Sequence, residues 1–327
     1  MAEFIYFCTI NQQITFFDNM INRELIRIKA VQLLYAFYEN ADQTLDAAEK
    51  EFLFSLDKAY ELYHLLLSLM VSLSHTGQCI EEAHANRAKR LKEYYAMPQK
   101  FLDNRFMAQL RENHQLSSYR EKNNAFWDEE NEDFLRRLYN TLKEQPFFQE
   151  YIQAADVSYE ADRELWRRIY REMLCNNDEL DEILEDDSVY WNDDKAIIDT
   201  FVLKTIRQFK ETYDSGQPLL PPYKNSEDPT FASTLFRTAI EGEKQYRQLL
   251  SEQTRNWDLE RIALMDLVIM QVALAEITTF PDIPLSVSIN EYVEIAKMYS
   301  TPRSGGYING MLDTIAKRLI SEGTLEK

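Results

Sequence analysis

The sequence predicts an all-α protein, and three observations lead to that fold class. Only 7 Gly and 9 Pro occur among 327 residues, well below the roughly 7% and 5% usual for these residues, so turns are few and helices long. Apolar residues recur at the three- and four-residue spacing of amphipathic helices along most of the chain. No stretch shows the alternation typical of a strand. These features favour a fold built by helix packing.

The length and the charge limit the domain organisation and the partners. A chain of 327 residues with 45% hydrophobic residues is long enough for two domains, or for one domain with a large insertion. The formal net charge is −19, which argues against an extensive nucleic-acid surface but permits a local basic patch. Most of the acidity lies in 123–194. No apolar run reaches the roughly 18 residues that a membrane span needs.

No residue pattern points to an enzyme. Cys8, Cys79 and Cys175 form no C-x-x-C pair, so neither a disulfide framework nor a cysteine zinc site is expected, and a cytoplasmic location fits. A G-x-S-x-G motif and a glycine-rich phosphate loop are both missing from the sequence. We therefore expect no catalytic residues and no cofactor.

Two Glu-x-x-His pairs, Glu61/His64 and Glu81/His84, are the only candidates for a metal site. This spacing occurs in the di-iron centres of four-helix bundles. The apolar stripe of the helix predicted over 44–75 leaves Glu61, His64 and Ser68 on the opposite, polar side. An exposed histidine beside a glutamate usually belongs to a solvated face, so no metal is expected.

The elements follow in order from the N-terminus. Residues 1–19 carry no basic group and no continuous apolar core, so they are interpreted as an extension, with Met20 as the natural start. A helix is predicted over 22–39, capped by Asn22. A second helix or helix pair follows over 44–75. Its apolar stripe, interpreted as bundle core, consists of Phe52, Leu56, Tyr60 (or Ala59), Tyr63, Leu66 and Met70.

The middle of the chain differs in character. The helical pattern continues from residue 76 through a cluster of cations, and 101–126 is predicted to be a long loop. Aromatic and acidic helices are then expected over 127–142, 162–175, 178–187 and 193–213. A dense group of prolines at 218–229 marks a boundary. The cations are Arg87, Lys89, Arg90 and Lys92.

The last hundred residues are predicted to be helical again. Helices are expected over 230–250, 258–277, 288–299 and 307–320, separated by the turn PDIP and the loop STPRSGG. The segment 258–277 is strongly apolar and is predicted to be the central buried helix.

Several of these segments resemble the NusB family of transcription antitermination factors. The similar segments are RIKAVQLLYAFYE, FASTLFRTAIEGEKQYRQLL, NWDLERIALMDLVIMQVALAEI, PDIPLSVSINEYVEIAKMYS and SGGYINGMLDTIAKRL. The resemblance covers 20–75 and 228–323. It implies a NusB-like helical bundle of two packed halves, interrupted by a helical insertion over 76–227 that is acidic in 123–194.

The resemblance also implies a function. NusB-like proteins bind boxA RNA of the ribosomal leader together with NusE, a small-subunit ribosomal protein, and modify the transcribing RNA polymerase elongation complex. The alternative is a non-catalytic scaffold for protein–protein interaction that has lost RNA binding. In the insertion, the cation cluster could extend RNA binding, and the acidic tract could attract a basic protein.

The resemblance assigns RNA binding to two places. The first is the start of the first helix, with Arg23, Arg27 and Lys29, which are expected to lie off the apolar stripe. Arginine offers charge-assisted contacts to phosphate, although a solvated helix face would look the same. The second is the loop before the last helix. There Arg303 and Ser304 stand at a helix N-terminus, and Tyr307 could stack on an unpaired base.

Other family positions are expected to be structural. Gly310 is interpreted as a close-packing position, and Asn309 as a structural hydrogen-bonding residue. Asn290 and Glu291 are expected to cap or brace helices. The same architectural role is expected for Trp257 and Arg261.

Overall fold

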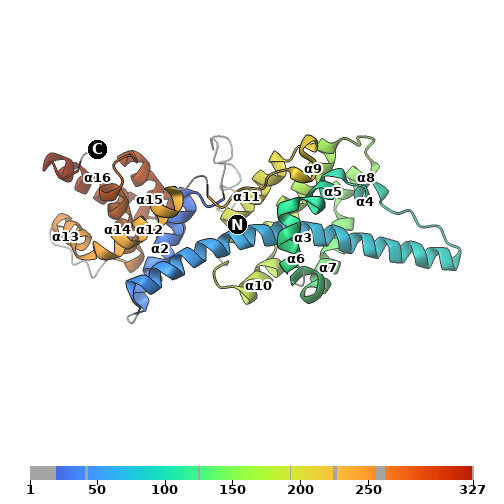
Figure 1. Cartoon of the computed structure of the whole chain (residues 1–327), viewed down its shortest axis with the longest axis horizontal. Helices are drawn as coiled ribbons and strands as arrows, with labels where there is room; N and C mark the ends of the chain where they lie inside the picture. Colours follow the sequence, from blue (N-terminus) through green and yellow to red (C-terminus); the bar gives the residue numbers. More distant parts are fainter. Residues whose placement is uncertain are drawn as a thin grey trace. The chain divides into compact units, whose positions relative to one another are not determined.

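The computed structural model describes residues 20–40, 43–123, 126–191, 193–223, 227–254 and 262–325. Within these ranges every regular element is a helix, which confirms the all-α class. The chain divides into two compact units (Figure 1): unit 1 comprises the chain up to Asp57 and from Pro221 onward, and unit 2 is Lys58–Leu220. The expected extension 1–19, with Trp257 and Arg261, lies outside the described residues. The predicted limits 20–75, 76–227 and 228–323 remain predictions.

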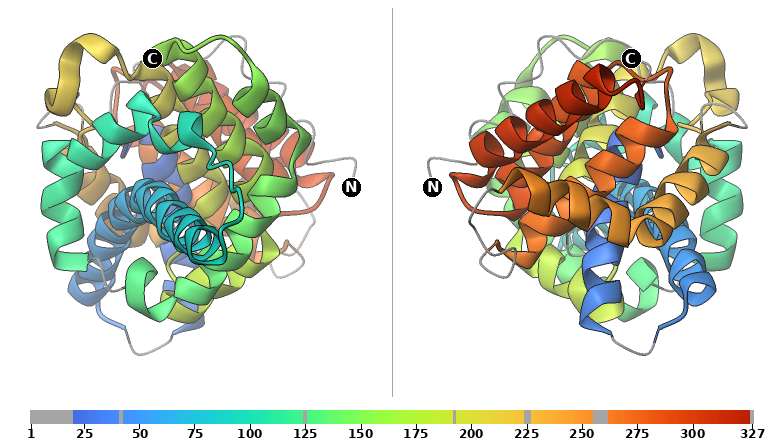
Figure 2. Two further views of the ribbon diagram at one scale, coloured as in Figure 1. Left: turned by 90° about the vertical axis from the view of Figure 1, so that its right-hand side faces the viewer. Right: turned by 90° about the vertical axis from the view of Figure 1, so that its left-hand side faces the viewer.

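Unit 1 is built around one buried helix. Its elements are α2 (Arg23–Glu39), the start of α3 (Leu45–Leu91), α12 (Glu227–Glu241), α13 (Glu243–Gln253), α14 (Leu264–Thr279), α15 (Leu285–Tyr299) and α16 (Ser304–Ser321). All residues from 266 to 277 of α14 are buried, and α14 contacts α2, α12, α13, α15 and α16. The right-hand view of Figure 2 looks onto these helices, with α2 in blue and α12 to α16 in orange to red. The predicted central helix is confirmed for its described part.

The beginning of α2 is fixed by a cap and by a distant part of the chain. The Asn22 side chain accepts a hydrogen bond from the Leu25 backbone N–H at 2.8 Å, as the predicted N-cap should. Just before it, the backbone N–H groups of Met20 and Ile21 donate to the carbonyls of Pro221 and Pro222 at 2.9 and 2.8 Å. These hydrogen bonds therefore join the N-terminal segment of unit 1 to the start of its C-terminal segment.

Unit 2 surrounds the middle of α3. Every residue from 62 to 74 is buried, so this part of the helix has no polar, solvated side. The expectation that His64 and Ser68 lie on such a side is wrong, because other helices cover it. The indole N–H groups of Trp127 and Trp191 donate to the α3 carbonyls of Leu65 and Lys58, both at 2.9 Å.

The helices that cover α3 in unit 2 are short. They are α4 (Gln99–Leu102), α5 (Arg105–Glu112), α6 (His114–Asn123), α7 (Glu132–Glu144), α8 (Pro146–Gln153), α9 (Tyr159–Ile169), α10 (Asp178–Asp187) and α11 (Lys195–Gln208), with the helical turns η1 (Phe126–Glu130), η2 (Tyr170–Leu174) and η3 (Glu211–Gly216). The loop predicted over 101–126 is wrong in its described part. Asn104 and Asn113 cap short helices there, accepting from Met107 and Leu116 N–H at 2.9 and 3.1 Å.

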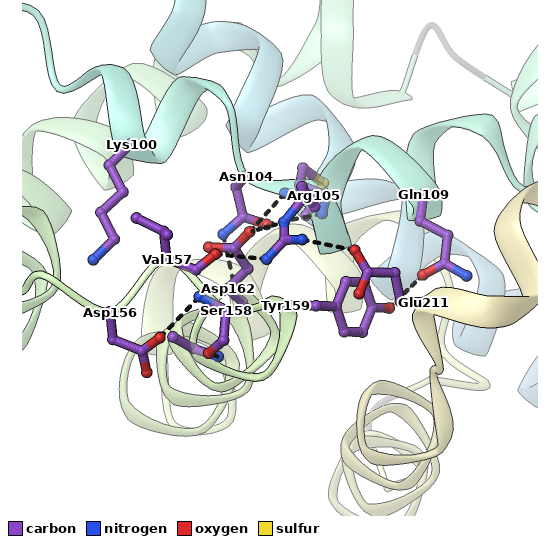
Figure 3. A network of polar contacts seen from close by, with 12 residues as sticks. Lys100, Asn104, Arg105, Gln109, Asp156, Val157, Ser158, Tyr159, Asp162 and Glu211 are labelled. Atoms are coloured by element: carbon purple, nitrogen blue, oxygen red, sulfur yellow. Dashed lines mark hydrogen bonds and ion pairs between the residues drawn. The ribbon is translucent and has the colours of Figure 1, made fainter.

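A polar network fixes α5 to its neighbours (Figure 3). The Arg105 guanidinium donates to Glu211 of η3 at 2.7 Å and to the Val157 carbonyl at 2.6 Å, while its backbone N–H donates to the buried Asp162 carboxylate at 2.9 Å. Tyr151 donates to the other oxygen of Asp162 at 2.7 Å. These contacts satisfy polar groups that helices of one or two turns leave free at their ends.

Among the described residues, no helix is both long enough and apolar enough to span a membrane.

Candidate nucleic-acid interface

Arg23, in the first turn of α2, is an accessible cation held in place by α12. Its guanidinium carbon lies 4.8 Å from the centroid of the Phe231 ring, and its Nε lies 3.9 Å from a carboxylate oxygen of Asp228. The side chain remains 42% exposed. The ring and the weak ion pair orient the cation but leave it free to contact a phosphate group.

Arg27, one turn further along α2, is buried. Its Nε and Nη2 donate to the two carboxylate oxygens of Glu276 at 2.7 and 2.9 Å, and Nη1 donates to Glu291 at 3.1 Å. Burial lowers the pKa of Arg27, but the hydrogen bonds and charge of Glu276 outweigh that effect and raise it above its ordinary value. The guanidinium is therefore charged and fully engaged inside unit 1.

Glu276 is the centre of this buried cluster. It is 0% exposed, and besides Arg27 it accepts hydrogen bonds from the hydroxyls of Ser288 and Tyr292 at 2.8 and 3.0 Å. The cluster joins α2, α14 and α15. Sequence reasoning missed Glu276. A carboxylate late in an apolar run nevertheless indicates a buried ion pair, because a buried charge needs a partner.

Their position off the apolar stripe does not leave Arg27 and Lys29 exposed to solvent. Arg27 is 4% exposed and Lys29 is 3% exposed, because α2 packs against α12, α14 and α15 at once. The expectation for Glu291 as a brace is confirmed by its contact with Arg27.

Ser304, in the first turn of α16, is also engaged inside unit 1. Its hydroxyl donates to Asp266 of α14 at 2.9 Å, and Ser300 donates to the other oxygen of that carboxylate at 2.5 Å. Ser304 is buried. It therefore fastens the turn between α15 and α16 to the start of α14, whereas its neighbour Arg303 is exposed.

The outer side of α16 is exposed to solvent, and few side chains cover its backbone. Tyr307 is 39% exposed, and Asn309 is exposed. An added Cβ at Gly306 or Gly310 would meet no atom within 4 Å, so the interpretation of Gly310 as a close-packing position is wrong. Asn309 forms no side-chain hydrogen bond within the described residues, contrary to the role expected of it. We call Arg303, Gly306, Tyr307, Asn309 and Gly310 the α16 face.

The structure does not bring Arg23 and Arg27 together with Ser304. Arg23 and Arg27 both lie over the Phe231 ring, and Arg27 is tied to Glu276. Ser304 is tied to Asp266, ten residues earlier in α14, which corresponds to about 15 Å of helix. The RNA-binding roles of these residues remain predictions.

The two Glu-x-x-His pairs have other partners. Glu61 accepts from Lys58 at 2.6 Å, and the His64 Nδ1 lies 3.0 Å from the Tyr60 carbonyl. Glu81 accepts from Lys143, Tyr95 and Tyr139 at 2.7, 2.5 and 3.1 Å. In the part of the chain that the structure describes, no group of three or more His, Cys, Asp or Glu residues is arranged to hold a metal ion.

Comparison with known proteins connects the chain to one family. A sequence model of the NusB family matches residues 200–317. The transcription antitermination protein NusB of Salinibacter ruber is 38% identical over 132 residues, which cover 38% of this chain and 82% of the relative. That of Geotalea daltonii is 34% identical over 132 residues, covering 40% of this chain and 88% of the relative. No solved structure matches. Because the chain covers most of the length of these relatives, it belongs to the NusB family.

Proposed function

We propose that this protein is a cytoplasmic transcription antitermination factor that binds RNA and acts without a cofactor. Its ligand would be a boxA-like single strand of the ribosomal leader, bound together with a NusE-like small-subunit ribosomal protein. The complex would then modify the RNA polymerase elongation complex. The observation that carries the proposal is the family membership, since its relatives are named transcription antitermination proteins.

The α16 face supports an RNA contact in particular. Arg303 offers donors to phosphate, and Tyr307 offers a ring on which a base can stack, a contact of about 1–3 kcal/mol. Gly306 and Gly310 leave space beside them, so a base or a phosphate can approach the helix backbone closely. A glycine within a helix costs up to about 1 kcal/mol relative to alanine, which a close approach by a ligand would explain.

Of the remaining predicted residues, Arg23 suits a second contact because it is exposed. Arg27, Lys29 and Ser304 are buried, so we assign them an indirect role. They hold α2 and the start of α16 in position, and the RNA would touch their neighbours.

The burial of these same three residues also favours a second candidate, the scaffold that has lost RNA binding. Under that hypothesis the chain would bind its protein partner but no boxA-like RNA.

A binding measurement separates the two candidates. The fluorescence anisotropy of a labelled boxA-type oligonucleotide should rise on addition of the full chain, with or without the NusE-like protein. Arg303→Gln and Tyr307→Ala should weaken this binding. Lys317→Gln is the matched control, because Lys317 lies on the same helix but is paired with Asp313 at 2.7 Å. Absence of binding in every condition, with the protein complex intact, would establish the scaffold instead.

A further inference from the structure

The C-terminal turns of α3 extend beyond the other helices of unit 2 (Figure 1). From residue 82 to residue 92 only Ala88 is buried. This segment carries four exposed cations within six positions, namely Arg87, Lys89, Arg90 and Lys92. We call residues 82–94 the α3 arm.

The cations of the α3 arm have no acidic partner in the described part of the chain, unlike several arginines elsewhere in unit 2. Arg137 is paired with Glu179, Arg167 with Glu164, and Arg168 with Glu172. Within the described residues, none of the four arm cations forms an ion pair or a side-chain hydrogen bond. The chain has 55 acidic and 36 basic residues, so an unneutralised cluster of cations produces a local positive potential in an acidic protein.

The dipole at the C-terminal end of α3 accounts for the presence of some of these cations, but not of all four. Lys89 and Arg90 lie in the last turn, where cations interact favourably with the helix dipole. Lys92 follows in the left-handed conformation, with φ 60°. The Glu93 N–H donates to the Ala88 carbonyl and the Lys92 N–H to the Lys89 carbonyl, at 2.9 and 3.3 Å. Glycine is the favoured residue at this position of such a helix end, so a lysine here carries a conformational cost.

An aromatic side chain projects beside these cations. Tyr94 is 93% exposed. The next residue, Tyr95, is fixed by its hydroxyl, which donates to Glu81 at 2.5 Å. The backbone on one side of Tyr94 is therefore held in place while its ring faces solvent, an arrangement that suits stacking with an unpaired base.

A recess continues the arm toward the body of unit 2. A cavity of about 240 Å³ is lined by Ile80, Ala83, His84, Arg136 and Asn140. Residues 80, 84 and 87 share one side of a helix, so the cavity adjoins the side of α3 that carries Arg87. Its lining adds the polar side chains of His84 and Asn140.

We propose that the α3 arm binds the phosphate backbone of single-stranded RNA, with Tyr94 stacked on an unpaired base. The inference takes only the class of ligand, RNA, from the proposed function. The binding site itself is separate, because the arm belongs to unit 2 and includes no residue of the α16 face. RNA is favoured over a membrane surface because the arm exposes only two large apolar side chains, Leu91 and Tyr94, whereas a helix that lies in a lipid interface carries a broad face of large apolar residues.

The test uses the full chain and two labelled oligonucleotides, a boxA-type strand and a uridine-only strand, at several salt concentrations. The arm variant combines Arg87→Gln, Lys89→Gln, Arg90→Gln and Lys92→Gly, with glycine chosen to suit the left-handed position. We expect the affinity for both strands to fall at least about tenfold at 0.1 M salt. The slope of the logarithm of the binding constant against the logarithm of the salt concentration should become shallower, by about 0.7 for each phosphate that the variant no longer neutralises. Tyr94→Ala should weaken binding about tenfold, and Tyr94→Phe should restore it.

A control variant removes the same number of charges from paired positions of unit 2, through Arg137→Gln, Arg167→Gln, Arg168→Gln and Arg171→Gln. It should leave affinity and salt slope nearly unchanged. Circular dichroism and thermal unfolding of each variant distinguish weaker RNA binding from a failure to fold.

The outcomes for the arm and for the proposed function are distinct. If the arm variant binds both strands like the parent while Arg303→Gln and Tyr307→Ala weaken boxA binding, the inference is overturned and the proposed function stands. If the parent shows no preference for boxA, yet loses affinity for both strands when the arm is changed, the inference stands and the proposed function fails. Arm-dependent binding to phosphatidylserine vesicles, with no arm-dependent binding to RNA, also overturns the inference.

Discussion

Arg27 and Glu276 form a buried ion pair with two hydrogen bonds, at 2.7 and 2.9 Å, between the first helix of unit 1 and its central helix. The carboxylate has no exposed surface, and its remaining acceptor capacity is taken by Ser288 and Tyr292. Such a pair specifies how α2, α14 and α15 pack. Its net contribution to stability is small, but loss of one partner leaves the other charged and buried.

Replacement of either partner should therefore destabilise unit 1 strongly. We expect Arg27→Leu or Glu276→Leu to lower the free energy of unfolding by about 3–5 kcal/mol, measured by urea denaturation. The double variant should be less destabilised than either single one, because no unpaired charge remains. Arg23→Ala is the control, expected to cost less than about 1 kcal/mol because Arg23 is 42% exposed and its ion pair with Asp228 is long, at 3.9 Å. Equal effects of Arg23→Ala and Arg27→Leu would contradict this account.

Replacement of the two open glycines of α16 by alanine should stabilise the protein, in contrast to the replacements in the buried ion pair. Gly306→Ala and Gly310→Ala should each raise the free energy of unfolding by about 0.5–1 kcal/mol, because they improve helix propensity in free space. Gly242→Ala should lower it, since a Cβ there would lie 2.4 Å from the Tyr246 ring. Thermal unfolding of the three variants tests the contrast, and a loss of stability at Gly310 would show that its surroundings are closed.

The exposed ring of Tyr307 gives a prediction about RNA affinity. Tyr307→Ala should weaken binding of a boxA-type strand by about 1–3 kcal/mol through the loss of stacking, while Tyr307→Phe should keep most of the affinity. Isothermal titration calorimetry measures both. If the alanine and phenylalanine variants bind equally well, base stacking on this residue is excluded.

Asp199 should make unit 2 more stable at mildly acidic pH. Its carboxylate accepts hydrogen bonds from Tyr170 and Lys195 at 2.6 and 3.1 Å, but burial raises its pKa to about 6 from an ordinary 3.8. The folded state therefore binds this proton more tightly than the unfolded state, and its stabilising effect is present below about pH 4 and lost as pH rises through 6.

Comparison with Asp199→Asn isolates this effect. The free energy of unfolding of the parent minus that of the variant should rise by about 2 kcal/mol between pH 7 and pH 4. Denaturant unfolding at several pH values provides the measurement. A difference that stays constant, or that falls toward low pH, would contradict the raised pKa.

Much of the fold could be predicted because helical periodicity and capping are local. Asn22 caps α2 as predicted, and the apolar run of α14 is buried along its length. The error at 101–126 has a local cause too. Asn104 and Asn113 were signals of helix starts, but helices of only two or three turns carry too few apolar residues to show a clear period.

The errors at the candidate site have a different cause. A helix period shows which residues share a side, but not how many sides other helices cover. Arg27, Lys29 and His64 each lie away from the strongest apolar stripe and are nevertheless buried, because their helices are surrounded. Glu276 and Asp266 could have indicated this, since two carboxylates in an apolar helix require buried donors. The α3 arm, by contrast, could be recognised from its composition alone.

The division of the chain also determines the order in which its parts can fold during synthesis. Unit 1 needs residues from both sides of unit 2, so α2 leaves the ribosome long before α14, the helix against which it packs. Translation proceeds at about 5–20 residues per second, so the 163 residues of Lys58–Leu220 delay that partner by roughly 10–30 s. During this time the apolar side of α2 has no native cover, while unit 2 can already be complete. Newly made chains should therefore depend most on chaperones before α14 emerges.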